Sequence, residues 1–433
     1  PHLLEVKKVY QNIKVTGVDL TAGKINVKNK YFFINTDFTE ALWELTENGV
    51  VIQNGSLGSL DIAPQTTKEV TIPLKQFAPK AAADYQLKIS FVLKEKTLWA
   101  DKGHVVAWDQ FGMPYEIPSP EEIALDSMAK VALENTDKAI AIKGDNFAVT
   151  FNKTTGLLES WTVEGKSMLA APLTPNFWRA ATDNDDGYNM TQNNGIWKNA
   201  YVKGSVDSVT AKQIAPQAVE VVVALKLAAA GSTQQIRYVV YGSGDILVQN
   251  QLQVARNLPF VPRFGLQAQI PGTFKAMRWY GRGPEENYAD RKSGYAVGIY
   301  NKDVYNPQHQ YIRPQENGNH TDVRWACWTD ETGFGILAVG QPMMNTSAWG
   351  YTQQDLEIAR HPYELLNRDT ITLNLDYGQT GVGGDNSWGA RPHRQYTLQA
   401  NQTYQYSFRL CPVHQGDISM IQSLADKALP AVE

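Results

Sequence analysis

Side chains that could do chemistry are concentrated in five short stretches of the sequence. The stretches are Arg179–Gly187, Trp279–Arg291, Arg313–His320, Ala359–Pro362 and Gly381–Gly389. They supply the groups that ion binding, acid/base catalysis and aromatic stacking need. No carboxylate pair among them has a context that marks a nucleophile and a general acid, and the sequence has no nucleophile elbow. We therefore assign no catalytic residue to this chain.

The last stretch is a glycine-rich loop around a tryptophan. Four glycines among the nine residues of Gly381–Gly389 let the backbone adopt positive φ and approach its neighbours closely. Asp385, Asn386 and Ser387 can bond nearby backbone groups and hold a tight loop. The loop is therefore expected to present the indole of Trp388, either to plug a core or to offer a flat apolar face to a ligand such as a sugar. The residues alone leave both uses open and favour packing.

The other stretches combine carboxylates with arginines or contain a histidine. Arg179–Gly187 has the oxygen ligands of a cation site but lacks the closing Glu of a calcium loop, so a charged turn is favoured. In Trp279–Arg291, ion pairs that hold a loop are favoured over acid/base work. His320 and His361 could exchange protons near neutral pH, although a structural role is favoured for both. The sequence predicts no metal site.

The first part of the chain has the pattern of an immunoglobulin-like β-sandwich. About one hundred residues contain roughly seven short strands with turn signals between them, among them Asn48-Gly49. Trp43 lies where such a sandwich has its central tryptophan, and Tyr85 is predicted to form a tyrosine corner. The predicted strands include Lys24–Lys28, Tyr31–Ile34, Leu42–Leu45, Val50–Ile52, Lys68–Ile72 and Tyr85–Phe91.

The rest of the chain is predicted to form one large antiparallel β-sandwich. Residues 112–120 carry a glycine and three prolines, which is typical of a linker. Strand patterns then continue to the C-terminus with few helical ones. We predict an all-β protein with two domains, residues 1–116 and 117–433. The later strands include Phe147–Phe151, Val219–Val223, Gln235–Tyr241 and Ile246–Asn250.

Composition excludes several functional classes. A net charge of −4 without a basic run argues against nucleic acid as a partner. No apolar run has the length of a membrane span, so we expect a soluble protein, cytoplasmic or periplasmic. Cys327 and Cys411 lie in apolar runs and form no metal or redox motif. The 11 Trp and 20 Tyr suit either carbohydrate contact or a large β-sandwich core. The chain opens at Pro1 without an initiator Met, and we interpret it as part of a longer protein.

Several of the five polar stretches, in the order in which they occur here, closely resemble the C-terminal β-sandwich domain of large bacterial β-galactosidases of glycoside hydrolase family two. Residues 1–110 resemble the immunoglobulin-like domain that precedes it in that family, and the likeness spans nearly the whole chain. The matching motifs are Asn176–Asp185, Gly281–Arg291, Pro314–Gly318 and Gly383–Trp388.

The resemblance implies the C-terminal part of a β-galactosidase, whose catalytic barrel lies upstream and outside this chain. The nucleophile, the acid/base Glu and the magnesium and sodium ligands would belong to that barrel, so no cofactor is expected here. The terminal domain would resemble the galactose mutarotase fold and form one wall of the active site. Trp388 would stack on sugar, chiefly on the aglycone side, and Gly187 would begin a loop that opens and closes. We assign substrate binding to Trp388, Gly187, Asp385 and Asn386.

Further expectations concern partners and alternatives. The partners would be a β-galactoside, the barrel of the same protein and further copies of the parent, with no nucleic acid or membrane. The alternative is an independent carbohydrate-binding module or an aldose epimerase, for which His320 and Glu316 form the only suitable pair. We also expect Trp388 to be exposed. The carboxylates Asp183, Asp185, Glu285, Glu286 and Glu316 are expected to pair with Arg179, Arg282, Arg291 or Arg324.

Overall fold

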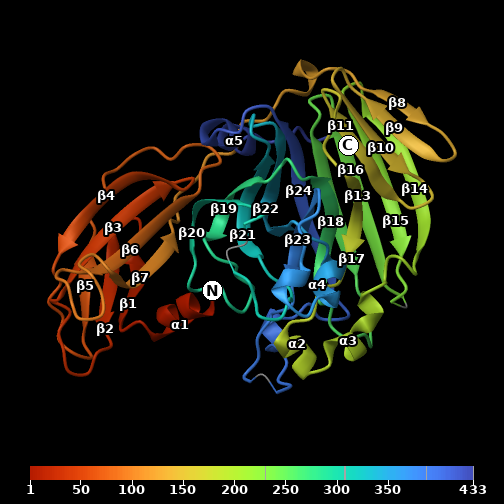
Figure 1. Cartoon of the computed structure of the whole chain (residues 1–433). Coiled ribbons are helices and arrows are strands. Elements are labelled where there is room, and N and C mark those ends of the chain that lie inside the picture. Colours follow the sequence, from red (N-terminus) through yellow and green to blue (C-terminus); the bar gives the residue numbers. More distant parts are fainter. Residues whose placement is uncertain (230, 307–308, 387, 433) are drawn as a thin grey trace. The chain divides into compact units, whose positions relative to one another are not determined.

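The computed structural model describes residues 1–229, 231–306, 309–386 and 388–432 (Figure 1). Most of the regular secondary structure in the described chain is β-strand, in antiparallel ladders, which confirms the all-β prediction. It divides into two compact units. The first comprises Pro1–Glu121, Ser293–Ile299 and Asp426–Ala428, and the second takes up the remainder.

The first unit is a sandwich of seven strands in two sheets. One sheet has the order β1-β2-β5 and the other the order β4-β3-β6-β7. Apolar side chains alternate with polar ones along the strands, as in β3, so each sheet has one apolar face that packs into a shared core. The strands are β1 (Ile13–Asp19), β2 (Lys24–Asn29), β3 (Thr39–Glu47), β4 (Val50–Gly58), β5 (Thr67–Thr71), β6 (Tyr85–Leu93) and β7 (Val105–Gly112).

The immunoglobulin-like features predicted for this unit are present. Trp43 is buried in the core. The hydroxyl of Tyr85 accepts a hydrogen bond from the backbone N–H of Lys80 at 2.9 Å, which is the tyrosine corner. Asn48 and Gly49 join β3 to β4 with φ angles of 49° and 80°, so both take the positive φ of a two-residue hairpin turn.

One local prediction for this unit was wrong, and one element was not foreseen. Tyr31–Ile34 forms no strand but a loop, in which the side chains of Phe32 and Phe33 are exposed. Its consecutive apolar residues lack the alternation that would give one face to the core. The N-terminal residues form a helix, α1 (His2–Tyr10), none of whose residues is buried.

The second unit contains most of the strands. In order they are β8 (Ala132–Asn135), β9 (Ala139–Lys143), β10 (Phe147–Asn152), β11 (Leu157–Val163), β12 (Lys166–Ser167), β13 (Ala171–Asn176), β14 (Ser205–Ala215), β15 (Ala218–Lys226), β16 (Thr233–Tyr241), β17 (Ile246–Gln253), β18 (Arg263–Pro271), β19 (Ala276–Gly283), β20 (Ala296–Asp303), β21 (His320–Thr329), β22 (Gly335–Trp349), β23 (Thr370–Gln379) and β24 (Thr403–Val413). The helices are short: α2 (Asp183–Gly187), α3 (Met190–Asn193), α4 (Gln353–Ile358) and α5 (Ile418–Ala425).

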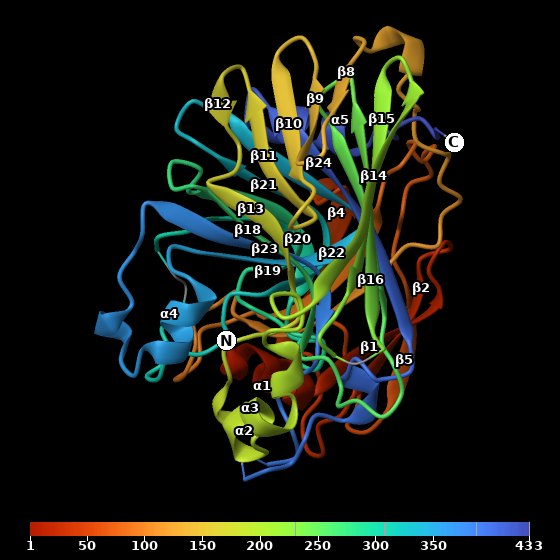
Figure 2. The same cartoon turned by 90° about the vertical axis from the view of Figure 1, so that its right-hand side faces the viewer.

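These strands form two rows around one apolar core. One row runs β14-β15-β16-β17-β24-β22-β21-β19 and the other β8-β9-β10-β11-β13-β18-β23-β22. Figure 2 shows β14–β16 and β10–β13 as separate groups of strands. The long strand β22 belongs to both rows, because Gly335–Gln341 pairs with β24 and Asn345–Trp349 pairs with β23.

Candidate functional site

Antiparallel pairing brings the first and last stretches together. Stretch Arg179–Gly187 follows β13, and stretch Gly381–Gly389 follows β23. Both strands pair with β18, where Arg263 lies opposite Gln379 and Gly265 lies opposite Asn176. Since neighbouring antiparallel strands place the end of one beside the start of the next, both stretches leave the sheet next to the start of β18.

The second and third stretches reach the same end of the sandwich through β19 and β21. β19 ends within stretch two, β21 begins at the end of stretch three, and the two strands pair. Backbone hydrogen bonds join the stretches directly. The N–H of Asn287 donates to the carbonyl of Asn319, and the N–H of Glu316 donates to that of Ala180. Four of the five stretches therefore form one cluster.

A buried arginine joins helix α2 to the glycine-rich loop. Arg179 binds both carboxylate oxygens of Asp185, with Nε to Oδ2 at 3.0 Å and Nη2 to Oδ1 at 2.8 Å. The same guanidinium donates to the carbonyls of Thr380 and Gly381. Burial, the largest single effect, lowers the pKa of Arg179, but the charge and hydrogen bond of Asp185, with smaller effects of Tyr188 and Glu316, together raise it overall. Asp185 also belongs to the capping box of α2 with Thr182.

The carboxylate of Asp290 holds the base of the loop. Its Oδ1 accepts from the N–H of Val382 at 3.1 Å, and its Oδ2 accepts from the N–H of Gly383 at 2.7 Å. Asn184 of α2 donates to the carbonyl of Val382 at 2.9 Å. Sequence reasoning gave Asp290 no such role. The signal was present, since a tight glycine-rich loop has backbone N–H groups that need an acceptor.

The tip of the loop presents the indole to solvent. Trp388 is 88% exposed, as predicted. Asn386 Oδ1 accepts from the N–H of Trp388 at 2.9 Å, and Asp385 contacts His393 at 2.8 Å. Ser387 lies outside the described residues. The carbonyl oxygen of Gly187 is only 3.0 Å from where a β-carbon on Gly389 would lie, so the end of α2 abuts this loop. All four residues assigned to substrate binding thus meet in one place, and their role stays a prediction.

The carboxylates pair with arginines, but only partly as predicted. Asp185 and Glu286 pair with Arg179 and Arg291, as expected. Glu316, in contrast, pairs with Arg263 at 2.6 Å. Asp183 also pairs with an arginine outside the predicted set, Arg313, at 2.9 Å, and Arg282 pairs with Asp322, a carboxylate outside the predicted set. Arg324 donates to the backbone carbonyl of Asp322.

Arg263 lies in a fully buried polar cluster with two carboxylates. Asp376 lies 3.3 Å from Arg263 Nε, and Gln379 donates to Glu316 at 3.0 Å. Burial raises the pKa of Asp376 to about 7; Arg263 opposes the rise and Glu316 adds to it. Burial also raises the pKa of Glu316. One guanidinium therefore serves two carboxyl groups that are hard to ionise together.

Both histidines have structural surroundings. His320 is fully buried against Trp279, with ring centroids 4.1 Å apart. Burial, followed by the Lys302 charge, lowers the pKa of His320 far below its usual value, so the imidazole is neutral at pH 7. His361 lies at the surface, where Nδ1 contacts Glu364 at 3.1 Å.

Neither a metal cluster nor a membrane-spanning helix is found among the described residues. No group of three or more His, Cys, Asp or Glu side chains within them is placed to hold a metal ion. None of the helices in the described ranges combines the length and apolar character needed to cross a bilayer.

Known proteins resemble this chain at the level of sequence and, more distantly, of fold. A β-galactosidase from Priestia megaterium is 35% identical over 416 residues, which cover 95% of this chain and 40% of the relative. A β-galactosidase from Halalkalibacterium halodurans is 34% identical over a match that covers 94% of this chain and 40% of the relative. The chain thus spans about 40% of these curated relatives. A galactose 1-epimerase structure from Lactobacillus acidophilus matches 66% of this chain and 99% of its own, at 10% identity and a TM-score of 0.41.

Two family models match consecutive parts of the sequence. Residues 25–114 match β-galactosidase domain 4, within the first unit. Residues 143–410 match the β-galactosidase small chain and contain the whole cluster of four stretches. This second match extends over more than half of the 433 residues. The protein therefore belongs to the β-galactosidase small-chain family.

Proposed function

We propose that this chain is the C-terminal part of a β-galactosidase of glycoside hydrolase family two, an enzyme that hydrolyses terminal β-D-galactosides. The chain contributes a sugar-stacking wall and an assembly surface, and the catalytic barrel lies outside it. Two facts support this division. The relatives named β-galactosidase are much longer than the matched region, and Asp185, Glu286 and Glu316 are each paired with an arginine.

The 88% exposure of Trp388 carries the proposal. On a flexible loop, an exposed indole would indicate no function. The base of this loop, however, is fixed by hydrogen bonds from Arg179 and Asn184 and to Asp290. The ring is thus held out at low entropic cost to a ligand. Its flat apolar face suits the C–H face of a sugar. Asp385 supplies polar groups at the rim, where sugar hydroxyls need partners.

The carboxylates of the cluster do not suit glycoside hydrolysis. Retaining hydrolysis needs two carboxyl groups about 5–5.5 Å apart, one of which gives up a proton to the leaving group. Asp185, Glu286 and Glu316 are instead engaged by Arg179, Arg291 and Arg263. The same pairing makes them poor ligands for the magnesium and sodium implied by the family resemblance. We place the nucleophile, the acid and the metal ligands on the barrel, in a parent protein that assembles as a homo-oligomer.

A single substitution in the full-length parent tests the role of Trp388. Trp388→Ala should weaken binding of the aglycone or acceptor sugar by about five- to tenfold, since one aromatic contact contributes about 1 kcal/mol. The readouts are KM for an aryl β-galactoside and the partition of product between water and an added acceptor. Trp99→Ala is the matched control, because Trp99 is also exposed (67%) but lies outside the cluster. Equal acceptor affinities in the wild type and Trp388→Ala would refute the stacking role.

The alternative function, an aldose epimerase, finds no support in the site. An epimerase needs a histidine and a carboxylate that can exchange protons with one sugar ring. His320 is buried against Trp279, and Glu316 is held by Arg263 and Gln379. Neither group faces an open surface, since both side chains are fully buried.

A further inference from the structure

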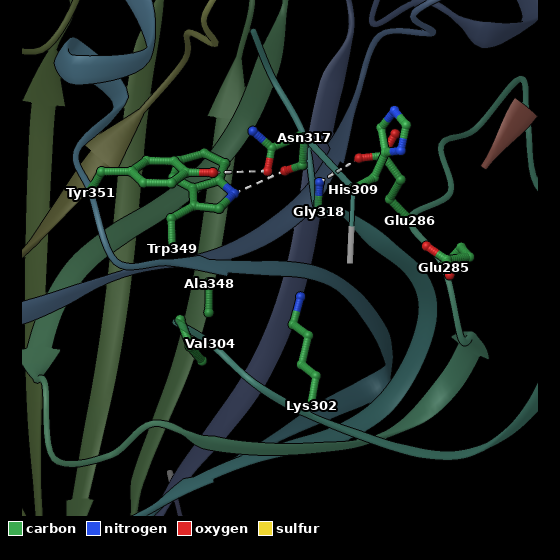
Figure 3. A pocket seen from close by; sticks show the side chains of 10 residues that line it. All are labelled: Glu285, Glu286, Lys302, Val304, His309, Asn317, Gly318, Ala348, Trp349 and Tyr351. Carbon is green, nitrogen blue, oxygen red and sulfur yellow. Dashed lines mark hydrogen bonds between the residues drawn. The ribbon is translucent and has the colours of Figure 1, made fainter. Parts of the chain in front are cut away.

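A pocket in the cluster, called the hollow below and separate from the Trp388 loop, has the chemistry of a small-ligand site. It lies in the second unit, where stretches two and three meet β20 and β22, and its volume is about 410 Å³ with its open mouth included. Figure 3 shows its aromatic and acidic lining on opposite sides, with an amine pointing in between them. The residues used in the argument are Glu285, Glu286, Lys302, Asn317, Trp349 and Tyr351.

The amine belongs to Lys302, which points into the hollow with few partners. Its Nζ lies 3.5 Å from Nε2 of His320 and 5.9 Å from the centre of the Trp279 ring. Among the described residues no carboxylate lies within ion-pair distance of it. Burial lowers the pKa of Lys302 to about 8, although the charges of Glu286 and Glu285 work against this fall. A part-buried ammonium without a close counter-ion is stabilised by a ligand oxygen that accepts its protons.

The acidic side of the hollow has one engaged and one available carboxylate. Glu286 accepts from Arg291 at 2.7 Å, from the N–H of Gly318 at 2.7 Å and from Tyr311. The side chain of Glu285 is half-buried and has no hydrogen-bond partner in the part of the chain that the structure describes. Glu285 can therefore accept a hydrogen bond from a ligand.

The aromatic side is rigid and preformed. The rings of Trp349 and Tyr351 are stacked, with centroids 6.2 Å apart and planes 12° apart. Asn317 fixes both rings: its carbonyl accepts from the indole N–H at 2.9 Å, and its Oδ1 accepts from the Tyr351 hydroxyl at 3.2 Å. Gly318 has a φ of +71°, and a β-carbon there would approach the indole to 3.3 Å, so glycine keeps this wall open.

We propose that this hollow binds one neutral sugar ring, as a second saccharide site in addition to the Trp388 loop. Lys302 donates to a hydroxyl oxygen of the sugar, and Glu285 accepts from a hydroxyl. A hydroxyl can do both, whereas an anion would face two carboxylates and a cation would face the ammonium. An adjoining hollow that shares His309, Asn317 and Tyr351 provides room for the rest of the ring.

Ligand-observed NMR of the full 433-residue chain with D-galactose tests the proposal. A ligand of this size in one shallow pocket should bind in the millimolar range. Lys302→Met keeps the length of the side chain and removes the donor, so it should weaken binding by about fivefold or more. Lys275→Met is the matched control, because Lys275 is a partly exposed lysine of the same unit, paired with Glu331 outside the hollow. Trp388→Ala should keep most of the binding.

Three outcomes would overturn the proposal: no saturable galactose binding to the wild type, equal affinity in Lys302→Met and wild type, or loss of all binding in Trp388→Ala. Lys302→Met should fold well, since it replaces a part-buried charge without a close counter-ion by an apolar side chain of similar length. If circular dichroism shows otherwise, Glu285→Leu, which removes the acceptor oxygens, takes its place, with the same expected loss. A direct readout is protection of Lys302 from an amine-acylating reagent by galactose, measured by mass spectrometry. Unchanged labelling at saturating galactose would also refute the site. These results are independent of acceptor binding by Trp388 in the full-length parent.

Discussion

A β-carbon on Gly381 would lie 2.5 Å from Oδ2 of Asp290, closer than any real side chain allows. The same carboxylate accepts from the N–H groups of Val382 and Gly383. Asp290 thus reaches the loop backbone only because residue 381 has no side chain. The contact explains why a glycine is required at the base of the Trp388 loop, four residues before the polar tip begins.

Replacing Asp290 should disturb the loop without removing the indole. In Asp290→Asn, the amide NH₂ would face a backbone N–H, and one half-buried donor would lose its acceptor at a cost of about 1 kcal/mol. We expect acceptor-sugar affinity in the parent to fall as in Trp388→Ala. Acrylamide quenching of tryptophan fluorescence in this chain should also change. Asp137→Asn, at an exposed position, should alter neither measurement. If affinity stays normal in Asp290→Asn, the loop does not depend on this anchor.

The isolated chain should fold but should not cleave an aryl β-galactoside above background. Its buried carboxylates are neutralised by arginines, and hydrolysis needs a carboxylate pair that is free to exchange protons. The measurement is an assay of the purified chain with a chromogenic galactoside, beside the full-length parent as a positive control. Turnover that disappears in Glu286→Gln would mean that this sandwich has its own active site.

Asp376 should make the second unit less stable as pH rises. The pKa of Asp376 in the folded protein is about 7 against an ordinary value of 3.8 for aspartic acid, so between these values the folded protein binds more protons than the unfolded chain. Stability is therefore greatest at the acidic end of this window and falls as pH increases towards 7. The full shift corresponds to at most about 4 kcal/mol.

Asp376→Asn isolates this contribution. The free energy of unfolding of the variant minus that of the wild type should be larger at pH 8 than at pH 5, as measured by urea denaturation. Asp137→Asn serves as the exposed control. A difference that does not change between the two pH values would show that Asp376 titrates normally in the folded protein.

The tyrosine corner should contribute measurably to the first unit. Tyr85→Phe removes the hydroxyl that accepts from the N–H of Lys80 and donates to Glu47 at 2.8 Å. The loss should be about 1–2 kcal/mol, because a half-buried N–H loses its acceptor. Calorimetry should show the change in the unfolding of the first unit alone. Tyr10→Phe, at an exposed tyrosine, should leave both units unchanged, and an equal effect of the two substitutions would contradict the corner's role.

Local patterns in the sequence predicted what depends on neighbouring residues. Alternation in β3 gave its buried face, and Asn48-Gly49 gave the hairpin. The exposure of Trp388 was expected from the family resemblance, which implies neighbours on a barrel outside this chain, whereas the loop residues alone favoured packing. The run Tyr31–Ile34 misled the prediction because apolar content without alternation does not define a strand face.

Contacts between residues far apart in the sequence could not be predicted, because local patterns report only on neighbouring residues. Arg263 and Glu316 are 53 residues apart, and they meet only because β18 starts where stretch three enters the cluster. Predicting that pair requires the register of β18 with β23, which no local pattern encodes. Lys302 looks like an ordinary strand lysine in the sequence, and only the fold places its amine in a hollow.

The strand β22 has a consequence for how the second unit opens. The two halves of β22 pair with β24 and β23. The two rows of strands therefore cannot separate without breaking backbone hydrogen bonds of β22. Amide hydrogens of β22 should therefore exchange with solvent only through global unfolding, as the slowest class in the unit. The Trp388 loop, rooted at the end of β23, is thus attached to the most persistent part of the sandwich.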